Sequence, residues 1–134
     1  MLETLLATLL LAQNGVCSGA DPAITSVVVA GMTPSGALNT YHLKGTVANL
    51  GKTRQPSNTL QFVDIYYDTN KVDARSIPPL GPGEQHTFTY DFQRASDARA
   101  NSSHFRFVLD FKQATSPTAA QDCSAANDVF RLRF

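Results

Sequence analysis

The amino-acid sequence predicts an all-β protein in which seven short antiparallel strands pack as a two-layer sandwich. Three observations favour this fold class. Short runs of β-branched and aromatic residues alternate with polar residues, clusters of turn-forming residues separate the runs, and no helical periodicity occurs after residue 20. The chain has 134 residues, a size typical of one domain with one hydrophobic core. A small closed barrel is the competing architecture.

The expected strands follow one another at short intervals. Apolar and polar residues alternate clearly in two of them. Leu43 and Val47 share one side of the strand at 41–49, and Phe105 and Phe107 share one side of the strand at 104–111. Aromatic residues on both sides of the third strand indicate a central position, and the fourth strand, which follows a tight turn, is expected at an edge. The expected strands cover residues 24–31, 41–49, 60–68, 71–77, 84–92, 104–111 and 128–134, with loops at 33–39, 93–103 and 112–127.

The stretch from 77 to 92 separates two of these strands. Its three prolines have no amide hydrogen to give to a sheet, and its two glycines tolerate the positive φ angles of a tight turn. Alternation then resumes, with Phe88 and Tyr90 on one side and Thr87 and Thr89 on the other. We therefore expect an edge strand to end here and the chain to cross to the opposite sheet.

Composition limits the classes of partner. Charged residues make up 16% of the chain and the formal net charge is zero, so no overall basic field would attract nucleic acid or an anionic membrane. Threonine, serine, asparagine and alanine are frequent, whereas lysine and glutamate are scarce. This composition favours a protein that is secreted or works at the cell surface or in the periplasm.

The first twenty residues fit two patterns. The apolar run "LLATLLLA", followed by small residues up to Ala20, is typical of a secretion signal, although Glu3 stands where such signals carry basic residues. The leucines at 2, 5, 6, 9 and 10 fit a retained amphipathic helix equally well. The run is too short to span a bilayer. Residues 1–20 are thus a signal peptide or a short helix, and 23–134 form the folded domain.

The two cysteines, Cys17 and Cys123, have no metal-binding or redox spacing. A disulfide between them is a hypothesis for the case in which the N-terminal segment is retained in an oxidising compartment. In an immunoglobulin-like sandwich, the start of the first strand and the loop before the last strand lie at the same end, so the two cysteines could approach each other. If a signal is removed after Ala20, Cys123 is left alone.

Four pieces of sequence, taken in order, resemble the CARDB family, the cell-adhesion-related immunoglobulin-like domain of bacteria and archaea. They are "GTVANLGK" (45–52), "VDIYYDTNKV" (63–72), "IPPLGPGEQHTF" (77–88), and "VLD" (108–110) followed by "DCSAAND" (122–128). The last piece departs from the family pattern, since Ala125 replaces an acid and Asp128 replaces an asparagine. The resemblance implies a seven-stranded immunoglobulin-like sandwich that serves as a surface, spacer or binding module.

Four oxygen-bearing side chains are candidates for a metal site. Asp110, Asp122, Asn127 and Asp128 could meet at one end of the sandwich, where calcium prefers such ligands. Asp122 and Asn127 fit equally a structural role, in which they hydrogen-bond nearby backbone amides and shape the loop. Calcium is the one cofactor that this pattern suggests.

We therefore expect a non-enzymatic binding or adhesion module that contacts a protein or a glycan through loops at 31–40, 50–59, 93–103 and 112–127. The alternative is a structural subunit that docks its N-terminal helix on a partner or on a second copy of itself, as a homo-oligomer. An enzyme is the third class. His42, His86 and His104 fall on different expected strands, no nucleophile motif occurs, and a filled sandwich offers no reaction cleft.

Overall fold

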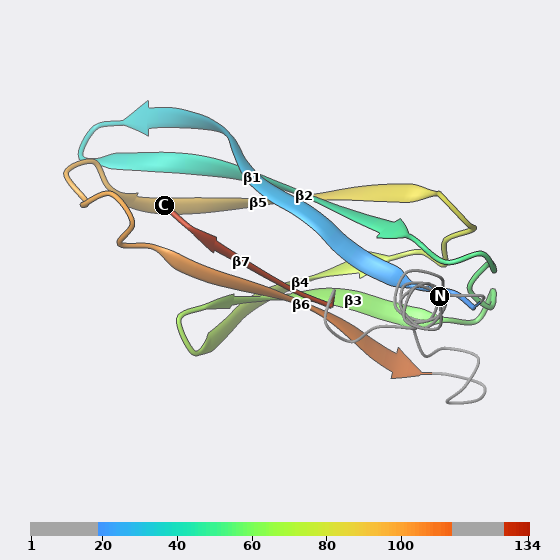
Figure 1. The fold of residues 1–134 in the computed structure, drawn as a ribbon. Coiled ribbons are helices and arrows are strands. Elements are labelled where there is room, and N and C mark those ends of the chain that lie inside the picture. Colours follow the sequence, from blue (N-terminus) through green and yellow to red (C-terminus); the bar gives the residue numbers. More distant parts are fainter. Residues whose placement is uncertain (1–18, 114–127) are drawn as a thin grey trace, which may run out of the picture.

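The computed structural model describes residues 19–113 and 128–134, which form two β-sheets packed face to face (Figure 1). The first sheet has the order β1-β2-β5 and the second the order β4-β3-β6-β7, and every neighbouring pair is antiparallel. The strands are β1 (Pro22–Ser35), β2 (Leu38–Asn49), β3 (Leu60–Tyr67), β4 (Asn70–Ile77), β5 (Gln85–Ala95), β6 (His104–Gln113) and β7 (Val129–Arg133). The expected all-β sandwich of seven antiparallel strands is confirmed.

The fourth strand determines how the sheets divide. In the constant-type immunoglobulin arrangement this strand joins the sheet of the first, second and fifth strands, which gives four strands facing three. Here β4 forms a hairpin with β3, so the division is three and four. The chain then crosses between the sheets from Pro78 to Glu84, as the prolines predicted, and β3 and β4 hold the expected central and edge positions.

The first hairpin corrects one expectation. The cluster of turn-forming residues predicted a loop at 33–39, but β1 continues to Ser35 and β2 begins at Leu38. Gly36, with a φ of 60°, provides the left-handed conformation of a two-residue hairpin turn. Pro34 has no amide hydrogen to donate, and it is tolerated here because β1 is an edge strand with one side unpaired.

The alternating residues fill the interior as predicted. Val47, Val63, Ile65 and Phe107 have no exposed surface. The ring of Phe88 lies directly over Gly45, its partner on the neighbouring strand, where any larger residue would occupy the space of the ring. The rhythm of apolar and polar residues therefore determines which side of each strand faces the core.

Side-chain hydrogen bonds of Asn49 hold one end of the sandwich together. Its Oδ1 accepts hydrogen bonds from the backbone amides of Asp21 and Gly51, both 2.9 Å long. Its Nδ2 donates to the carbonyl oxygens of Thr53 and Leu80, again at 2.9 Å. Asn49 is fully buried, and its four side-chain bonds reach three segments of backbone, at Asp21, at 51–53 and at Leu80. It fixes where β1 starts and where β2 ends.

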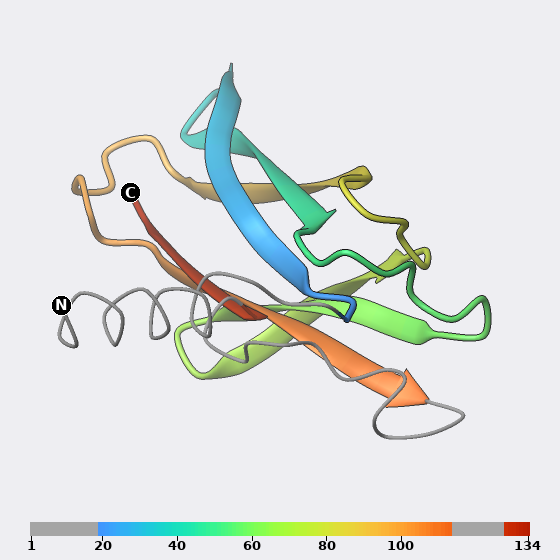
Figure 2. The same ribbon diagram turned by 45° about the vertical axis from the view of Figure 1, so that its right-hand side comes forward.

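The strand β1 leaves one sheet edge without charge. It lies on the same side of the sandwich as β7, the edge of the other sheet (Figure 2). From Ser26 to Ser35 it carries no charged residue, whereas the other edge strands, β4, β5 and β7, all do. Val28, Val29 and Met32 on this strand are exposed.

Several expectations concern residues that lie outside the described ranges. These are the signal peptide or helix up to residue 18, and the pairing of Cys17 with Cys123. In the ranges that are described, no helix is long and apolar enough to cross a membrane.

Candidate binding site

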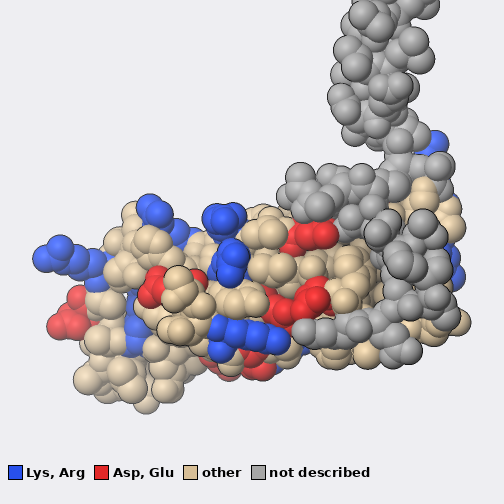
Figure 3. Space-filling view, turned by 90° about the horizontal axis from the view of Figure 1, so that it is seen from below, with Lys and Arg blue, Asp and Glu red and all other residues tan. Residues whose placement is uncertain are grey.

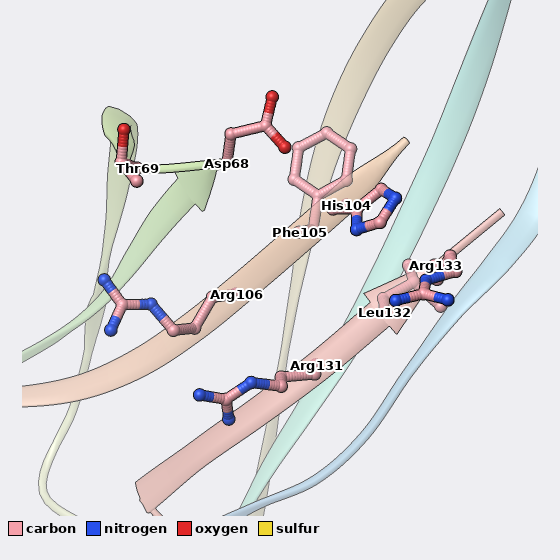
Figure 4. A pocket seen from close by; sticks show the side chains of 8 residues that line it. All are labelled: Asp68, Thr69, His104, Phe105, Arg106, Arg131, Leu132 and Arg133. Atoms are coloured by element: carbon pink, nitrogen blue, oxygen red, sulfur yellow. The ribbon is translucent and has the colours of Figure 1, made fainter. Parts of the chain in front are cut away.

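An open hollow of about 580 Å³ lies beside the β3–β4 turn, along the start of β6 and the end of β7 (Figure 4). Its volume falls within the range of about 300–1,000 Å³ that is usual for ligand pockets. The residues that line it are Asp68, Thr69, His104, Phe105, Arg106, Arg131, Leu132 and Arg133. Only the β3–β4 turn among these segments is a loop, so the hollow is built mainly on strands.

Strand register places four nitrogen-rich side chains in two adjacent rows. Arg106 on β6 lies directly opposite Arg131 on β7, and His104 lies opposite Arg133. Because successive side chains alternate between the faces of a sheet, all four share the outer face, while Phe105 and its neighbours pack in the core. Figure 4 shows Arg106 and Arg131 extending in the same direction from neighbouring strands.

An aromatic ring holds one of these arginines in place. Tyr66 on β3 is the cross-strand partner of Arg106 on β6, and the Arg106 guanidinium carbon lies 4.5 Å from the centre of the Tyr66 ring. Such stacking attracts a cation to the ring face and leaves the N–H groups at the edge of the guanidinium able to donate hydrogen bonds. The Arg106 side chain is therefore oriented before any ligand arrives.

The guanidinium groups of the hollow have no acidic partner among residues 19–113 and 128–134. In the described part of the chain, four ion pairs form, and none involves Arg106, Arg131 or Arg133. Like charges placed directly opposite each other on neighbouring strands destabilise a sheet. The lining carries three arginines and one aspartate, so the hollow has a local excess of positive charge although the whole chain is neutral. Elsewhere on the side of the molecule seen in Figure 3, basic and acidic residues are interspersed. An anion bound in the hollow would relieve the repulsion.

The β3–β4 turn supplies a different chemistry on the other side of the hollow. The backbone amide of Asp68 donates a 3.0 Å hydrogen bond to the carbonyl oxygen of His104, which fixes the turn beside β6. Asp68 has a φ of 54°, a left-handed conformation that aspartate tolerates in turns. Its carboxylate and the hydroxyl of Thr69 form no hydrogen bond or ion pair within the described residues, so both can accept hydrogen bonds from a ligand.

The predicted metal ligands are only partly described. Asp110 lies on β6 next to Asp64 of β3, and burial together with the hydrogen bond to Asp110 raises the pKa of Asp64 despite the nearby Lys71. Asp128 directly precedes β7. Asp122 and Asn127 lie outside the described ranges, and the residues inside them contain no group of three metal-binding side chains. The calcium site stays a prediction.

The three histidines lie on different strands, β2, β5 and β6. His42 forms a chain of contacts, since its Nε2 lies 2.8 Å from the hydroxyl of Thr33 and its Nδ1 lies 2.8 Å from the carboxylate of Asp91. A hydroxyl, an imidazole and a carboxylate in this order resemble a hydrolase triad. However, the side chains of His42 and Asp91 are 41% and 63% exposed on an open sheet face, where water weakens such contacts. We interpret the chain as a contact that joins β1, β2 and β5.

Sequence reasoning missed the hollow. The alternation did place Arg131 and Arg133 on one side of the last strand, opposite its apolar side. What it lacked was the pairing of β6 with β7, which brings Arg106 and His104 beside them. The hollow also does not lie in the expected binding loops at 31–40, 50–59 and 93–103, and binding through the loops stays a prediction. One signal in the sequence could have indicated the hollow. The pattern of a basic, an apolar and a basic residue occurs in two expected strands, at 104–106 and at 131–133.

Comparison with known proteins supports the fold. No family model and no curated protein sequence matches the chain. The crystal structure of the CARDB domain of the PF1109 protein from Pyrococcus furiosus, in complex with di-metal ions, matches with a TM-score of 0.59 at 15% identity, covering 88% of this chain and 89% of that chain. This chain has the fold of CARDB domains.

Two further solved structures agree with this result. The solution structure of the same Pyrococcus furiosus domain matches with a TM-score of 0.56 at 18% identity, covering 87% of this chain and 94% of that one. A domain of a protein named as a cell surface protein, from Methanosarcina acetivorans, matches with a TM-score of 0.55 at 21% identity, covering 86% of this chain and 90% of that chain. The predicted resemblance to CARDB domains is thus confirmed in the fold.

Proposed function

We propose that this CARDB-like domain is an extracytoplasmic binding module, secreted or held at the cell surface, that binds an anionic group of its ligand in the basic hollow. The observation that carries this proposal is the pair of adjacent rows, Arg106 with Arg131 and His104 with Arg133, in which no guanidinium has an acidic partner among the described residues. The arrangement lowers the stability of the sheet unless an anion neutralises it.

Arginine is suited to this role. Its planar guanidinium donates two parallel hydrogen bonds to a carboxylate, sulfate or phosphate group, which adds direction to the charge attraction. Because the hollow is built mainly on strands and Arg106 is stacked on Tyr66, less side-chain freedom is lost on binding than at a flexible loop. The structural similarity to a domain of a cell surface protein supports a location outside the cytoplasm.

An array of glycans and proteins, probed with the full chain in the presence and absence of calcium, tests the proposal. We expect acidic ligands to be retained and their binding to weaken as salt rises, since exposed charges are screened. The double variant Arg106→Gln/Arg131→Gln should bind at least tenfold more weakly.

The matched control is Arg99→Gln, the same chemical change at an exposed arginine in the loop between β5 and β6. It should bind like the wild type. Ligands whose binding is unchanged in the double variant would show that the hollow is not the binding site. The arm with calcium reports separately on the predicted metal site.

A further inference from the structure

We infer that the hollow selects an acidic saccharide, meaning a sugar that carries a carboxylate or sulfate group beside free hydroxyl groups. This inference rests on the proposed function of the same site and names its ligand class. Its basis is that the lining has two chemistries on opposite sides. Arg106, Arg131 and Arg133 offer N–H donors with positive charge, while Asp68 and Thr69 offer oxygen acceptors (Figure 4).

The carboxylate of Asp68 discriminates between classes of anionic ligand. An acidic peptide or a nucleic acid carries repeated negative charges, and Asp68 would repel the charge next to the one that the arginines hold. A sugar ring instead carries hydroxyl groups beside its single charged group. A hydroxyl donates to a carboxylate in a strong, charge-assisted hydrogen bond. Asp68 is thus unfavourable for a polyanion and favourable for an acidic sugar.

The remaining lining residues are compatible with a sugar. The apolar lining residues add little to the binding surface, because Phe105 is 3% exposed and Leu132 packs against the core. The hydroxyl of Thr69 can donate as well as accept, as the hydroxyl groups of a sugar require. The hollow is open to solvent, so a polysaccharide could continue beyond it on both sides.

Titration calorimetry of the full chain with four defined probes tests the inference. They are galacturonic acid, which carries one carboxylate, galactose 6-sulfate, which carries one sulfate, a neutral dextran oligosaccharide, and a poly-glutamate peptide. We expect one of the two acidic sugars to bind. Dextran and poly-glutamate should bind more weakly or not at all. The first two probes distinguish a carboxylate from a sulfate as the anionic group.

The variant Asp68→Asn makes the test decisive, because charge and hydrogen bonding predict opposite results. Removing a negative charge from a basic site would strengthen the binding of any anion by simple electrostatics. If Asp68 accepts hydroxyl hydrogen bonds, Asp68→Asn should instead weaken binding of the acidic sugar at least threefold. Asp97→Asn, at an exposed aspartate in the β5–β6 loop, is the matched control and should have no effect. Equal thermal melting curves would show that the variants are folded.

The outcomes separate the two proposals. Weaker binding of the acidic sugar in both Arg131→Gln and Asp68→Asn supports the inference. If poly-glutamate binds as tightly and Asp68→Asn strengthens the binding of every anionic probe, the saccharide inference is wrong while the proposed function holds. If Arg131→Gln changes the binding of none of the probes, both proposals are wrong.

Discussion

The side-chain amides of Gln55 and Gln61 face each other in the interior and exchange two hydrogen bonds, of 2.9 and 2.8 Å. The same amides also reach the proline-rich crossing. Gln55 Oε1 accepts a 3.0 Å bond from the amide of Leu80, and Gln61 Nε2 donates a 3.1 Å bond to the carbonyl oxygen of Pro78. Both glutamines are at most 1% exposed. They give the backbone of this crossing the hydrogen bonds that a sheet cannot provide.

Replacing Gln61 with leucine should therefore destabilise the domain strongly. The change leaves the amide of Gln55 and the carbonyl of Pro78 buried with fewer partners, and each such loss costs about 1–3 kcal/mol. We expect the free energy of unfolding, measured with urea, to fall by about 3 kcal/mol. Gln85→Leu, at an exposed position of β5, is the control and should change stability little. A small effect of Gln61→Leu would show that water can replace these bonds.

Gly45→Ala should be destabilising because of the ring above it. A Cβ at this position would lie within 2.7 Å of three ring atoms of Phe88, which is itself buried. Such overpacking costs about 1–3 kcal/mol, measurable by thermal or urea unfolding. Adding Phe88→Leu should recover part of the Gly45→Ala loss. Gly31→Ala, whose added Cβ would make only ordinary contact with His42, is the matched change in the same sheet and should be tolerated.

Asp64 should make stability fall as pH rises. Its pKa is raised in the folded protein by burial and by Asp110, so the folded state holds its proton where the unfolded state releases it. The decrease begins near the unfolded pKa of about 3.9 and continues up to the raised folded pKa. Urea unfolding between pH 3 and pH 8 should show this component in the wild type and not in Asp64→Asn. An unchanged pH profile in the variant would contradict the assignment to Asp64.

Arg94 links the end of the chain to the first sheet. It donates 2.8 Å hydrogen bonds to the hydroxyl of Ser103 and the carbonyl oxygen of Phe134, and a 3.2 Å bond to the hydroxyl of Tyr41. Its guanidinium carbon also lies 4.5 Å from the ring centre of Tyr41 and 4.7 Å from that of Phe134. Lysine cannot reproduce a planar group that donates in several directions.

Arg94→Lys should therefore lower the free energy of unfolding by about 2 kcal/mol. A second measurement identifies the cause. The hydrogen bond from Arg94 lowers the pKa of Tyr41, so the variant should raise that pKa in an NMR titration of labelled tyrosine. Arg99→Lys provides the control for both measurements. A loss of stability with no change in the titration of Tyr41 would mean that the contact with Tyr41 is unimportant.

The sequence was sufficient to predict which face of each strand is buried, because side chains alternate between the two faces. Val63 and Ile65, for example, could only share a side, and both prove to be fully buried. The hairpin of β1 and β2 was predicted less well. Its turn-forming residues are compatible with a strand at an edge, and pairing with β2 outweighs their local preference.

The site could not be predicted, because it depends on which strands are neighbours. Arg106 and Arg131 are far apart in sequence and meet only through the register of β6 with β7. The paired glutamines illustrate the same limit within the interior. Gln55 lies in a polar stretch typical of a surface loop, and only the path of the chain toward Leu80 buries it. Contacts between distant segments leave little trace in a single sequence.

The uncharged stretch of β1 has a consequence for handling the protein. Lysine, glutamate or aspartate on an edge strand discourages other chains from adding to the sheet, and this strand has none from Ser26 to Ser35. At high protein concentration, molecules should therefore associate first along β1, where the three-stranded sheet of one molecule would extend into that of the next. A single lysine in place of Val28 should keep concentrated samples monodisperse.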